Sequence, residues 1–183
     1  MERRSDDGRT ETGHRLTVGG GARVRADVVD VYVFRRTDAG EVEFLQIRRA
    51  NDPLKGTWQP VMGHAEAGES SVSAAARESA EEVGLDVRSE TCVGMWALEQ
   101  VHPFYIAAID TVVMSPRFAC EVGADWEPRL NHEHTAFRWT KAPADFCWPG
   151  QKLALREIVE EIVPETSAAR GLLRIDVNAV SRG

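Results

Sequence analysis

The chain has 183 residues, of which 43% are hydrophobic, and a formal net charge of −7 at neutral pH. This length suits a single domain with its own core, and the acidic balance argues against a nucleic-acid-binding surface, which draws on clustered lysine and arginine. No apolar stretch approaches the length of a membrane helix, the polar N-terminus is no signal peptide, and Cys92, Cys120 and Cys147 lack any paired spacing, so we expect a cytoplasmic protein with reduced thiols and with neither nucleic acid nor a membrane as its partner.

Residues 1–22 are predicted to form a disordered tail. They are charged, rich in glycine and almost without apolar residues, a composition that cannot bury enough apolar surface to fold. The folded domain is expected over residues 23–166. Residues 167–183 form a C-terminal extension with some apolar residues, which could add a strand or contribute to a homodimer.

A β-hairpin is predicted at the start of the domain. Residues 26–34 are mostly β-branched or aromatic, residues 38–40 (Asp-Ala-Gly) are turn-like, and residues 43–48 form a second strand. A loop over 51–56 follows. The short apolar run from Trp58 to Met62 then leads into the most informative part of the chain.

Residues 63–85 contain a loop and a helix whose carboxylates share one face. On a helix that turns about 100° per residue, positions three and four apart are neighbours, so Glu78, Glu81 and Glu82 fall within an arc of roughly 100°. Alone these carboxylates would repel one another and take up protons, whereas a hard divalent cation such as Mg²⁺ or Mn²⁺ satisfies them and still accepts phosphate oxygens and water. The pattern therefore predicts a metal site for diphosphate chemistry, and a solvated, Glu-rich surface helix is the plainer alternative.

Other residues around these acids support the same helix. Arg77 is expected to pair with Glu69 and so to tie the preceding loop to the helix. Gly63 and Gly68 would let that loop turn tightly, and Gly84 suits a helix C-terminus. The opposite face would pack against a sheet while the acids look outward. Its small or apolar residues are Val72, Ala75, Ala76, Ser79 and Val83.

The second half of the chain is predicted to complete an α/β sandwich. Residues 87–101 and 104–114 are apolar and β-prone, and we predict that they pair with each other. Residues 115–133 contain prolines, glycine and acids and are predicted as an irregular excursion, before a last strand over 135–140. Apolar residues recur at helical spacing in 151–163, which predicts a second amphipathic helix, and a sheet with a helix on each side is an α/β sandwich.

The spacing Gly63, five residues, Glu69, seven residues, Arg77-Glu78-x-x-Glu81-Glu82-x-Gly84 resembles the signature box of the Nudix hydrolases. The resemblance implies an α/β/α sandwich with a mixed central sheet, and an enzyme that cleaves phosphoric anhydrides with Mg²⁺ or Mn²⁺. The chain departs from the family at Ser79, where a larger aliphatic residue is usual, and at His64, where many relatives have glycine. The metal ligands that the resemblance implies are Gly63, Glu78, Glu81 and Glu82, with Glu82 central, and its catalytic set adds Glu69 and Arg77.

Glu133 is the candidate for a further acid outside the box. The resembling enzymes often recruit such an acid, as metal ligand or general base, from a distant loop. Glu133 lies just before the last predicted strand, from which a side chain could reach the acidic helix face. An ordinary loop acid is the alternative.

The substrate would be chosen by residues outside the box. Segments 58–63 and 133–139 and Trp148 resemble the branch that releases pyrophosphate from nucleoside or pterin triphosphates, which implies a small nucleotide-type substrate. Trp58, His64 and Phe104 are candidate contacts for it, and Trp96 is a further candidate for stacking, although aromatic residues in strands are usually core. ADP-ribose, dinucleoside polyphosphates and nucleotide sugars stay open, as does a sensor that binds a nucleotide without cleaving it, whereas RNA ends are disfavoured by the acidic charge.

Overall fold

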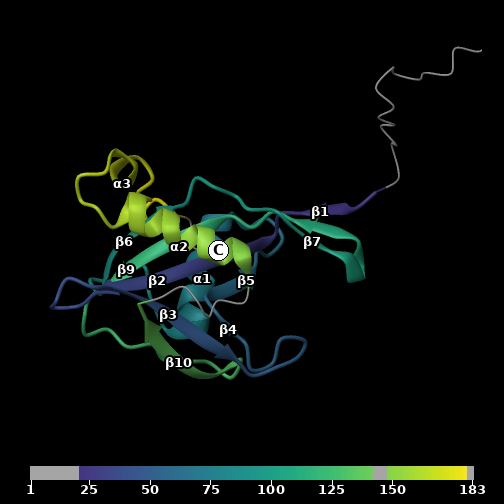
Figure 1. Cartoon of the computed structure of the whole chain (residues 1–183), viewed down its shortest axis with the longest axis horizontal. Coiled ribbons are helices and arrows are strands. Elements are labelled where there is room, and N and C mark those ends of the chain that lie inside the picture. The colour runs from purple at the N-terminus through teal and green to yellow at the C-terminus, as the bar shows by residue number, and fades with distance from the viewer. Residues whose placement is uncertain (1–20, 142–147, 181–183) are drawn as a thin grey trace, which may run out of the picture.

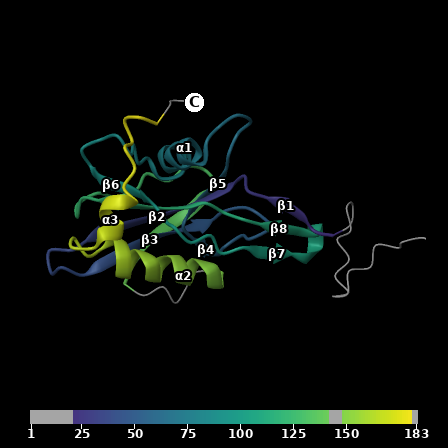
Figure 2. The same cartoon turned by 90° about the horizontal axis from the view of Figure 1, so that it is seen from above.

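The computed structural model describes residues 21–141 and 148–180. All but the last two residues of the predicted tail, and also Cys147, lie outside these ranges. Within them, no helix has the length and apolar character needed to span a membrane. The body of the molecule is a central sheet with helix α1 on one face and helix α2 on the other (Figure 2), which confirms the predicted α/β/α sandwich.

The predicted hairpin is present at the centre of the sheet. Strand β2 (Val28–Arg36) pairs antiparallel with β3 (Val42–Arg49), and Gly40 adopts a positive φ of 75° in the turn between them. β2 is buried along most of its length because it has neighbours on both sides and a helix over each face. The β-branched run in the sequence therefore marks a central strand.

The main sheet has seven strands and is mixed, as expected. Its order is β10 (His134–Thr140), β3, β2, β9 (Arg117–Val122) and β6 (Cys92–Ala97), while β4 (Trp58–Gln59) pairs with β3 and β5 (Val61–His64) pairs with β2. Only the β2–β9 pair is parallel among these pairings of the described residues. The short apolar run before the acidic helix thus supplies two short strands.

Two predictions for the second half are wrong. Residues 115–133 were expected to be irregular, but they contain β9, which is buried throughout. Residues 87–101 and 104–114 do not pair with each other, since β6 pairs with β9. β9 was not predicted because it contains Arg117 and Glu121, which are buried as ion-pair partners. A search for apolar residues therefore does not recognise it as a core strand.

A second, three-stranded sheet extends from the body as an arm (Figures 1 and 2). It consists of β1 (Arg23–Arg25), β8 (Thr111–Val113) and β7 (Phe104–Ile106), with a short 3₁₀ turn, η1 (Ala107–Ile109), between the last two in chain order. β1 runs parallel to β8, and β7 antiparallel to it. The segment predicted as one long strand over 104–114 is therefore a small hairpin.

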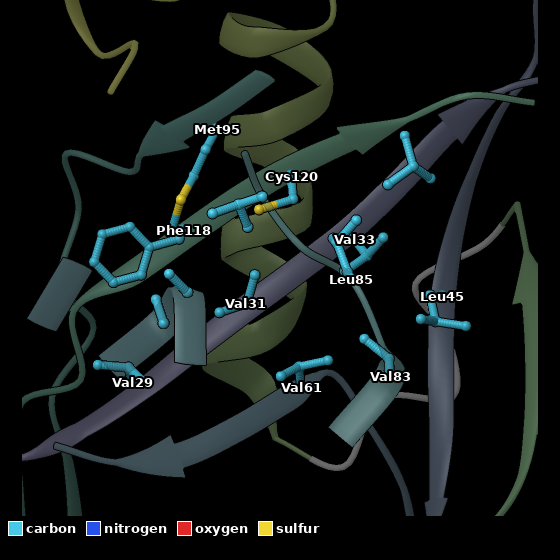
Figure 3. Packing of buried hydrophobic residues seen from close by; sticks show 14 of the residues in the cluster. Val29, Val31, Val33, Leu45, Val61, Val83, Leu85, Met95, Phe118 and Cys120 are labelled. Atoms are coloured by element: carbon cyan, nitrogen blue, oxygen red, sulfur yellow. The ribbon is translucent and has the colours of Figure 1, made fainter. Parts of the chain in front are cut away.

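Helix α1 (Ser71–Val83) is the helix predicted from the acidic spacing. The Ser70 side chain accepts a hydrogen bond from the Ser73 N–H at its start, and Gly84 ends it in the left-handed conformation with a φ of 71°. Ser79 is fully buried, and its hydroxyl donates to the Ala75 carbonyl at 2.7 Å. A small polar residue therefore fits this face, which packs on the core that Figure 3 shows, formed by Val29, Val31, Val33, Leu45, Val61, Val83, Leu85 and their neighbours.

Helix α2 (Pro149–Glu157) covers the opposite face of the sheet and continues into a π-helical turn, η3 (Ile158–Ile162). It begins two residues earlier than predicted because Pro149 occupies the first turn, where its missing N–H is no loss. Its apolar side packs on a second core cluster, which includes Tyr32, Phe34, Phe44, Trp96, Ala154, Leu155, Ile158 and Ile162.

The C-terminal extension lies along the free edge of β6. After helix α3 (Ala168–Leu172), the Ile175 N–H donates to the Met95 carbonyl, and Arg174 forms an isolated bridge with Trp96. Ile175 and Val177 pack on the core below α1. Part of the extension thus adds strand-like contacts to the sheet, and its predicted role in a homodimer stays a prediction.

Candidate active site

The buried end of the site is formed by two acids of α1 that lie against strand β5. Glu82 is only 3% exposed, and its Oε2 accepts a hydrogen bond from the Met62 N–H at 3.3 Å. A Cβ at Gly63 would overlap the Glu78 carboxyl group. The prediction that Gly63 serves a tight turn is therefore wrong, because Gly63 is a strand residue whose missing side chain makes room for Glu78. The prediction that the acids look outward holds for Glu81 but not for Glu78 and Glu82.

Arg77 organises the outer side of the site. Its Nη2 lies 3.0 Å from Glu69 Oε2, and its Nη1 lies 2.9 Å from Glu78 Oε1 and 3.1 Å from Glu81 Oε2. Nη2 also donates to the His64 carbonyl at 2.7 Å. The structure thus contains the predicted Arg77–Glu69 pair, which lowers the pKa of Glu69 and anchors the loop before α1, where Gly68 has a φ of 84°.

The two inner acids are held in an environment that disfavours their charge. Burial raises the pKa of Glu82 to about 8, with the Met62 N–H opposing the shift and the charges of Glu78 and Glu133 adding to it. Burial also raises the pKa of Glu78, although Arg77 opposes this. Adjacent carboxyl groups that are costly to ionise are the setting in which a bound cation gives the largest relief.

The three carboxylates expected to meet do not form a ready metal cluster. Across residues 21–141 and 148–180, no group of three His, Cys, Asp or Glu side chains is arranged closely enough to hold a metal ion. Glu81 Oε2 pairs with Arg77 Nη1, and the Glu81 side chain is 55% exposed. The donor set itself, hard carboxylate oxygens with raised proton affinity, is nevertheless the kind that Mg²⁺ or Mn²⁺ takes, and the pair Glu78 and Glu82 fits such an ion best.

Glu133 lies near these acids at the rim of the site. Its carbonyl accepts the Ala50 N–H at 2.8 Å, and its own N–H donates to Asn131 Oδ1 at 2.9 Å, so the backbone of its loop is held in place. The side chain is exposed, and its charge contributes to the raised pKa of Glu82. Of the predicted residues, Glu78 and Glu133 therefore lie close enough to Glu82 for their charges to act on it.

Arg49 is a charged residue of this region that the sequence reading missed. It ends strand β3 and lies opposite His134 of β10 in the register. Its positive charge opposes the rise in the pKa of Glu82. The sequence could have indicated it. Alternate residues of a strand face the same side, so Arg49 is on the same side as the core residues Leu45 and Ile47.

A cavity of about 340 Å³ opens on the other side of β5, between the sheet and the start of α2. Its walls are mostly apolar and include Met62, Phe104 and Trp148. The Phe104 and Trp148 rings are nearly parallel, with an interplanar angle of 12° and centroids 6.1 Å apart. Gln151 adds a buried polar group, and its side-chain oxygen accepts the Trp148 N–H at 3.2 Å.

A buried ion pair forms the polar part of this cavity. Asp30 Oδ2 lies 3.4 Å from Arg117 Nε, and Asp30 Oδ1 accepts from the Ser115 hydroxyl at 3.2 Å. Arg117 also donates from Nη1 to the Gly150 carbonyl at 3.0 Å, which ties it to α2. Burial raises the pKa of Asp30, and the charge of Arg117 is the largest effect that opposes it. Neither residue was singled out from the sequence, because charges within a strand are ordinarily surface residues.

The three predicted substrate contacts do not share one place. Phe104 lines the cavity. Trp58 lies under the Arg138 guanidinium, 4.2 Å from the ring centroid, and is not part of the cavity wall. His64 is exposed beside Arg25, whose Nη2 is 3.4 Å from His64 Nδ1. Trp96 is fully buried, so the suggestion that it stacks on substrate is wrong and the core alternative holds.

Comparison with known proteins gives a family match over most of this architecture. The family model described as NUDIX domain matches residues 24–144. The solved structure of the Ap4A hydrolase of C. elegans superposes with a TM-score of 0.62 at 20% identity, covering 74% of this chain and 96% of that one. The dihydroneopterin triphosphate pyrophosphohydrolase of E. coli has a TM-score of 0.60 at 26% identity, covering 72% and 94%.

Curated proteins match in sequence as well. The asymmetrical bis(5'-nucleosyl)-tetraphosphatase of Sus scrofa is 33% identical over 112 residues, which are 58% of this chain and 73% of that protein. An octanoyltransferase of Myxococcus xanthus is 38% identical over 105 residues, or 56% of this chain. The match spans only 28% of the Myxococcus protein, so it concerns about a quarter of that molecule.

Proposed function

The chain belongs to the Nudix family of hydrolases that act on phosphoric anhydrides, and we propose that it cleaves a P–O–P linkage in a nucleoside or pterin polyphosphate with Mg²⁺ or Mn²⁺. The observation that carries the proposal is Glu82, a buried carboxyl group that has a backbone N–H but no counter-ion among the described residues. A buried acid without a positive partner is costly. It is retained, in this proposal, to hold a divalent cation.

In this proposal some residues of α1 and of the preceding segment bind the ion, and others fix the shape of the site. Glu78 and Glu82 are the main ligands in this proposal, the Gly63 backbone and Glu81 complete the set, and Arg77 with Glu69 fixes the loop. When bound, the cation neutralises phosphate charge and lowers the pKa of a bound water. An oxygen of the exposed Glu133 carboxylate takes the proton from the attacking water.

The cavity beside β5 is the place that we propose for the heterocycle. Its volume of about 340 Å³ lies in the range of roughly 300–1,000 Å³ that is typical of small-molecule sites. Met62 connects the two places, since its side chain lines the cavity while its N–H donates to Glu82. A planar ring against Phe104 or Trp148 would thus leave its phosphates near the acids. The names of the pig and E. coli relatives support a nucleosyl or pterin polyphosphate.

A substrate panel tests this function. The full chain with Mg²⁺ is assayed for phosphate and pyrophosphate release from nucleoside triphosphates, dihydroneopterin triphosphate, a bis(5'-nucleosyl) tetraphosphate, ADP-ribose and a nucleotide sugar. We expect turnover of at least one polyphosphate, and a loss of at least about a hundredfold in Glu82→Gln, more than the loss typical of residues that only support a metal ligand. Glu160→Gln removes an exposed acid of η3 and should leave the rate unchanged.

The outcome also separates this proposal from a nucleotide sensor. A sensor would show a ligand-dependent rise in melting temperature with no product from any compound. Full activity of Glu82→Gln would show that the site is wrongly assigned. Cleavage of a 5'-triphosphate oligonucleotide alone would replace the small-molecule substrate by an RNA end.

A further inference from the structure

Arg49 directs its side chain to the same face of β3 as the core residues below α1. Successive side chains of a strand alternate between faces. Leu45 and Ile47 belong to the core cluster that also contains Val83 of α1, and Arg49 continues this series at the end of the strand. Arg48 belongs to the other series, is exposed, and donates from Nε to the Gly56 carbonyl.

The guanidinium of Arg49 has no partner in the described part of the chain. Its Nε is buried and without a hydrogen bond, and no ion pair joins Arg49 to any residue within 21–141 and 148–180. Arg77 and Arg117, by contrast, each contact carboxylates and carbonyl oxygens. A half-buried cation without a counter-charge is unfavourable, so Arg49 is suited to an anion that arrives from outside.

The groups that face Arg49 leave an anion as the fitting ligand. His134 lies opposite in the register, and its Nδ1 is 3.3 Å from Asn131 Oδ1, an acceptor, so the ring has a tautomer that donates there. Burial lowers the pKa of His134 and so disfavours a charged ring. Glu82 is close enough for its charge to be coupled with that of Arg49, and the charges of Glu133 and Arg49 both act on His134, but no ion pair joins Arg49 to either acid in the described part of the chain. Among the described residues, Arg49 is thus the cation whose charge acts on Glu82.

We propose that Arg49 binds a phosphate group of the substrate and holds it beside the acids of α1. The inference rests on the proposed function, which places a polyphosphate at this end of β5. A guanidinium presents a planar fork of N–H donors that matches two phosphate oxygens, which a point charge cannot do equally well. Arg49 would thus offset the repulsion between the substrate's phosphates and the nearby carboxylates.

Binding of methylenebisphosphonate, a P–C–P analogue that cannot be hydrolysed, tests the inference. The affinity of the full chain is measured by calorimetry with Mg²⁺ present. We expect Arg49→Gln to weaken it by roughly tenfold to a hundredfold, the range for a lost hydrogen bond to a charged group. Arg49→Lys should fall between wild type and Arg49→Gln, and the matched variant Arg48→Gln should bind as wild type does.

Two further measurements distinguish phosphate binding from a structural role. Without phosphonate, Mn²⁺ should bind Arg49→Gln as tightly as wild type or tighter, since a positive charge near the acids is gone. The melting temperature of the metal-free variant should be unchanged or higher, because the cation has no partner to lose. Mn²⁺ binding or melting temperature that falls together with phosphonate affinity would overturn the proposal.

The result is independent of the outcome of the substrate panel. If wild type hydrolyses a polyphosphate but Arg49→Gln binds phosphonate as Arg48→Gln does, the phosphate site is wrong and the hydrolase proposal stands. If no compound is cleaved but phosphonate binding still depends on Arg49, the hydrolase proposal is wrong and the phosphate site stands. Failure of wild type to bind phosphonate at all would overturn the phosphate site.

Discussion

Two buried carboxyl groups lie on opposite faces of the same pair of strands, and their surroundings differ in one respect. Asp30 of β2 and Glu82 of α1 are each 3% exposed. Met62, which is opposite Asp30 in the β2–β5 register, donates its N–H to Glu82. Asp30, however, has Arg117 as an ion-pair partner, whereas Glu82 has no cationic contact among the described residues.

This difference separates a structural charge from a functional one. A buried charge with a partner and hydrogen bonds can join elements of a fold, as Asp30 and Arg117 join β2, β9 and the start of α2. A buried acid with no cation keeps a proton at neutral pH, and it gains most from an ion that binds later. Arg49 is likewise a partly buried charged residue without a counter-ion among the described residues, but its charge is positive.

The largest expected effect comes from breaking the paired site. Asp30→Ala leaves Arg117 buried without its counter-charge, and we expect the free energy of unfolding to fall by about 3–5 kcal/mol, measured by urea denaturation. The matched variant Asp38→Ala, in the exposed turn after β2, should change it little. Replacing both Asp30 and Arg117 by leucine should recover much of the loss, and a double variant as unstable as Asp30→Ala would contradict the comparison.

The unpaired site should make the stability of the protein depend on pH. The pKa of Glu82 is raised to about 8 in the folded protein, from an ordinary value near 4.5. The folded state therefore holds a proton that the unfolded state releases, so stability falls as pH rises from about 4.5 to about 8 and is level above that. In EDTA, wild type should lose up to a few kcal/mol relative to Glu82→Gln between pH 5 and pH 9, and equal pH profiles for the two proteins would be inconsistent with this assignment.

Gly63→Ala tests whether the missing side chain is needed for Glu78. The added methyl group would overlap the Glu78 carboxyl, and overpacking of this kind costs about 1–3 kcal/mol. We expect a lower melting temperature and weaker Mn²⁺ binding, because Glu78 must move. Gly123→Ala is the control, since a Cβ there meets no atom within 4 Å, and a loss of similar size in both variants would point to backbone effects alone.

The smallest effect is expected at Glu81. This side chain is 55% exposed and pairs with Arg77, and exposed ion pairs contribute at most about 1 kcal/mol. Glu81→Gln should therefore reduce turnover by no more than roughly fivefold, much less than Glu82→Gln. Equal losses in the two variants would contradict the prediction that Glu82 is the central ligand.

Much of the fold was predictable because it depends on local periodicity. The β-branched run of β2, the acidic spacing of α1 with its end at Gly84, and the apolar spacing of α2 each carry their own signal. The Arg77–Glu69 pair was also predictable, since both residues belong to one short segment. β9 was missed because Arg117 and Glu121 interrupt its apolar pattern, and their partners come from other parts of the chain.

The amino-acid sequence alone determined that acids and an arginine would share one helix with a small apolar face behind them, because a helix repeats within a few residues. Only the tertiary structure decided that Glu82 is buried while Glu81 is exposed, because that depends on how α1 docks on β5. The same holds for the cavity between Phe104 and Trp148 and for the unpaired Arg49. Each brings together residues distant in the chain, and such contacts follow from packing rather than from local pattern.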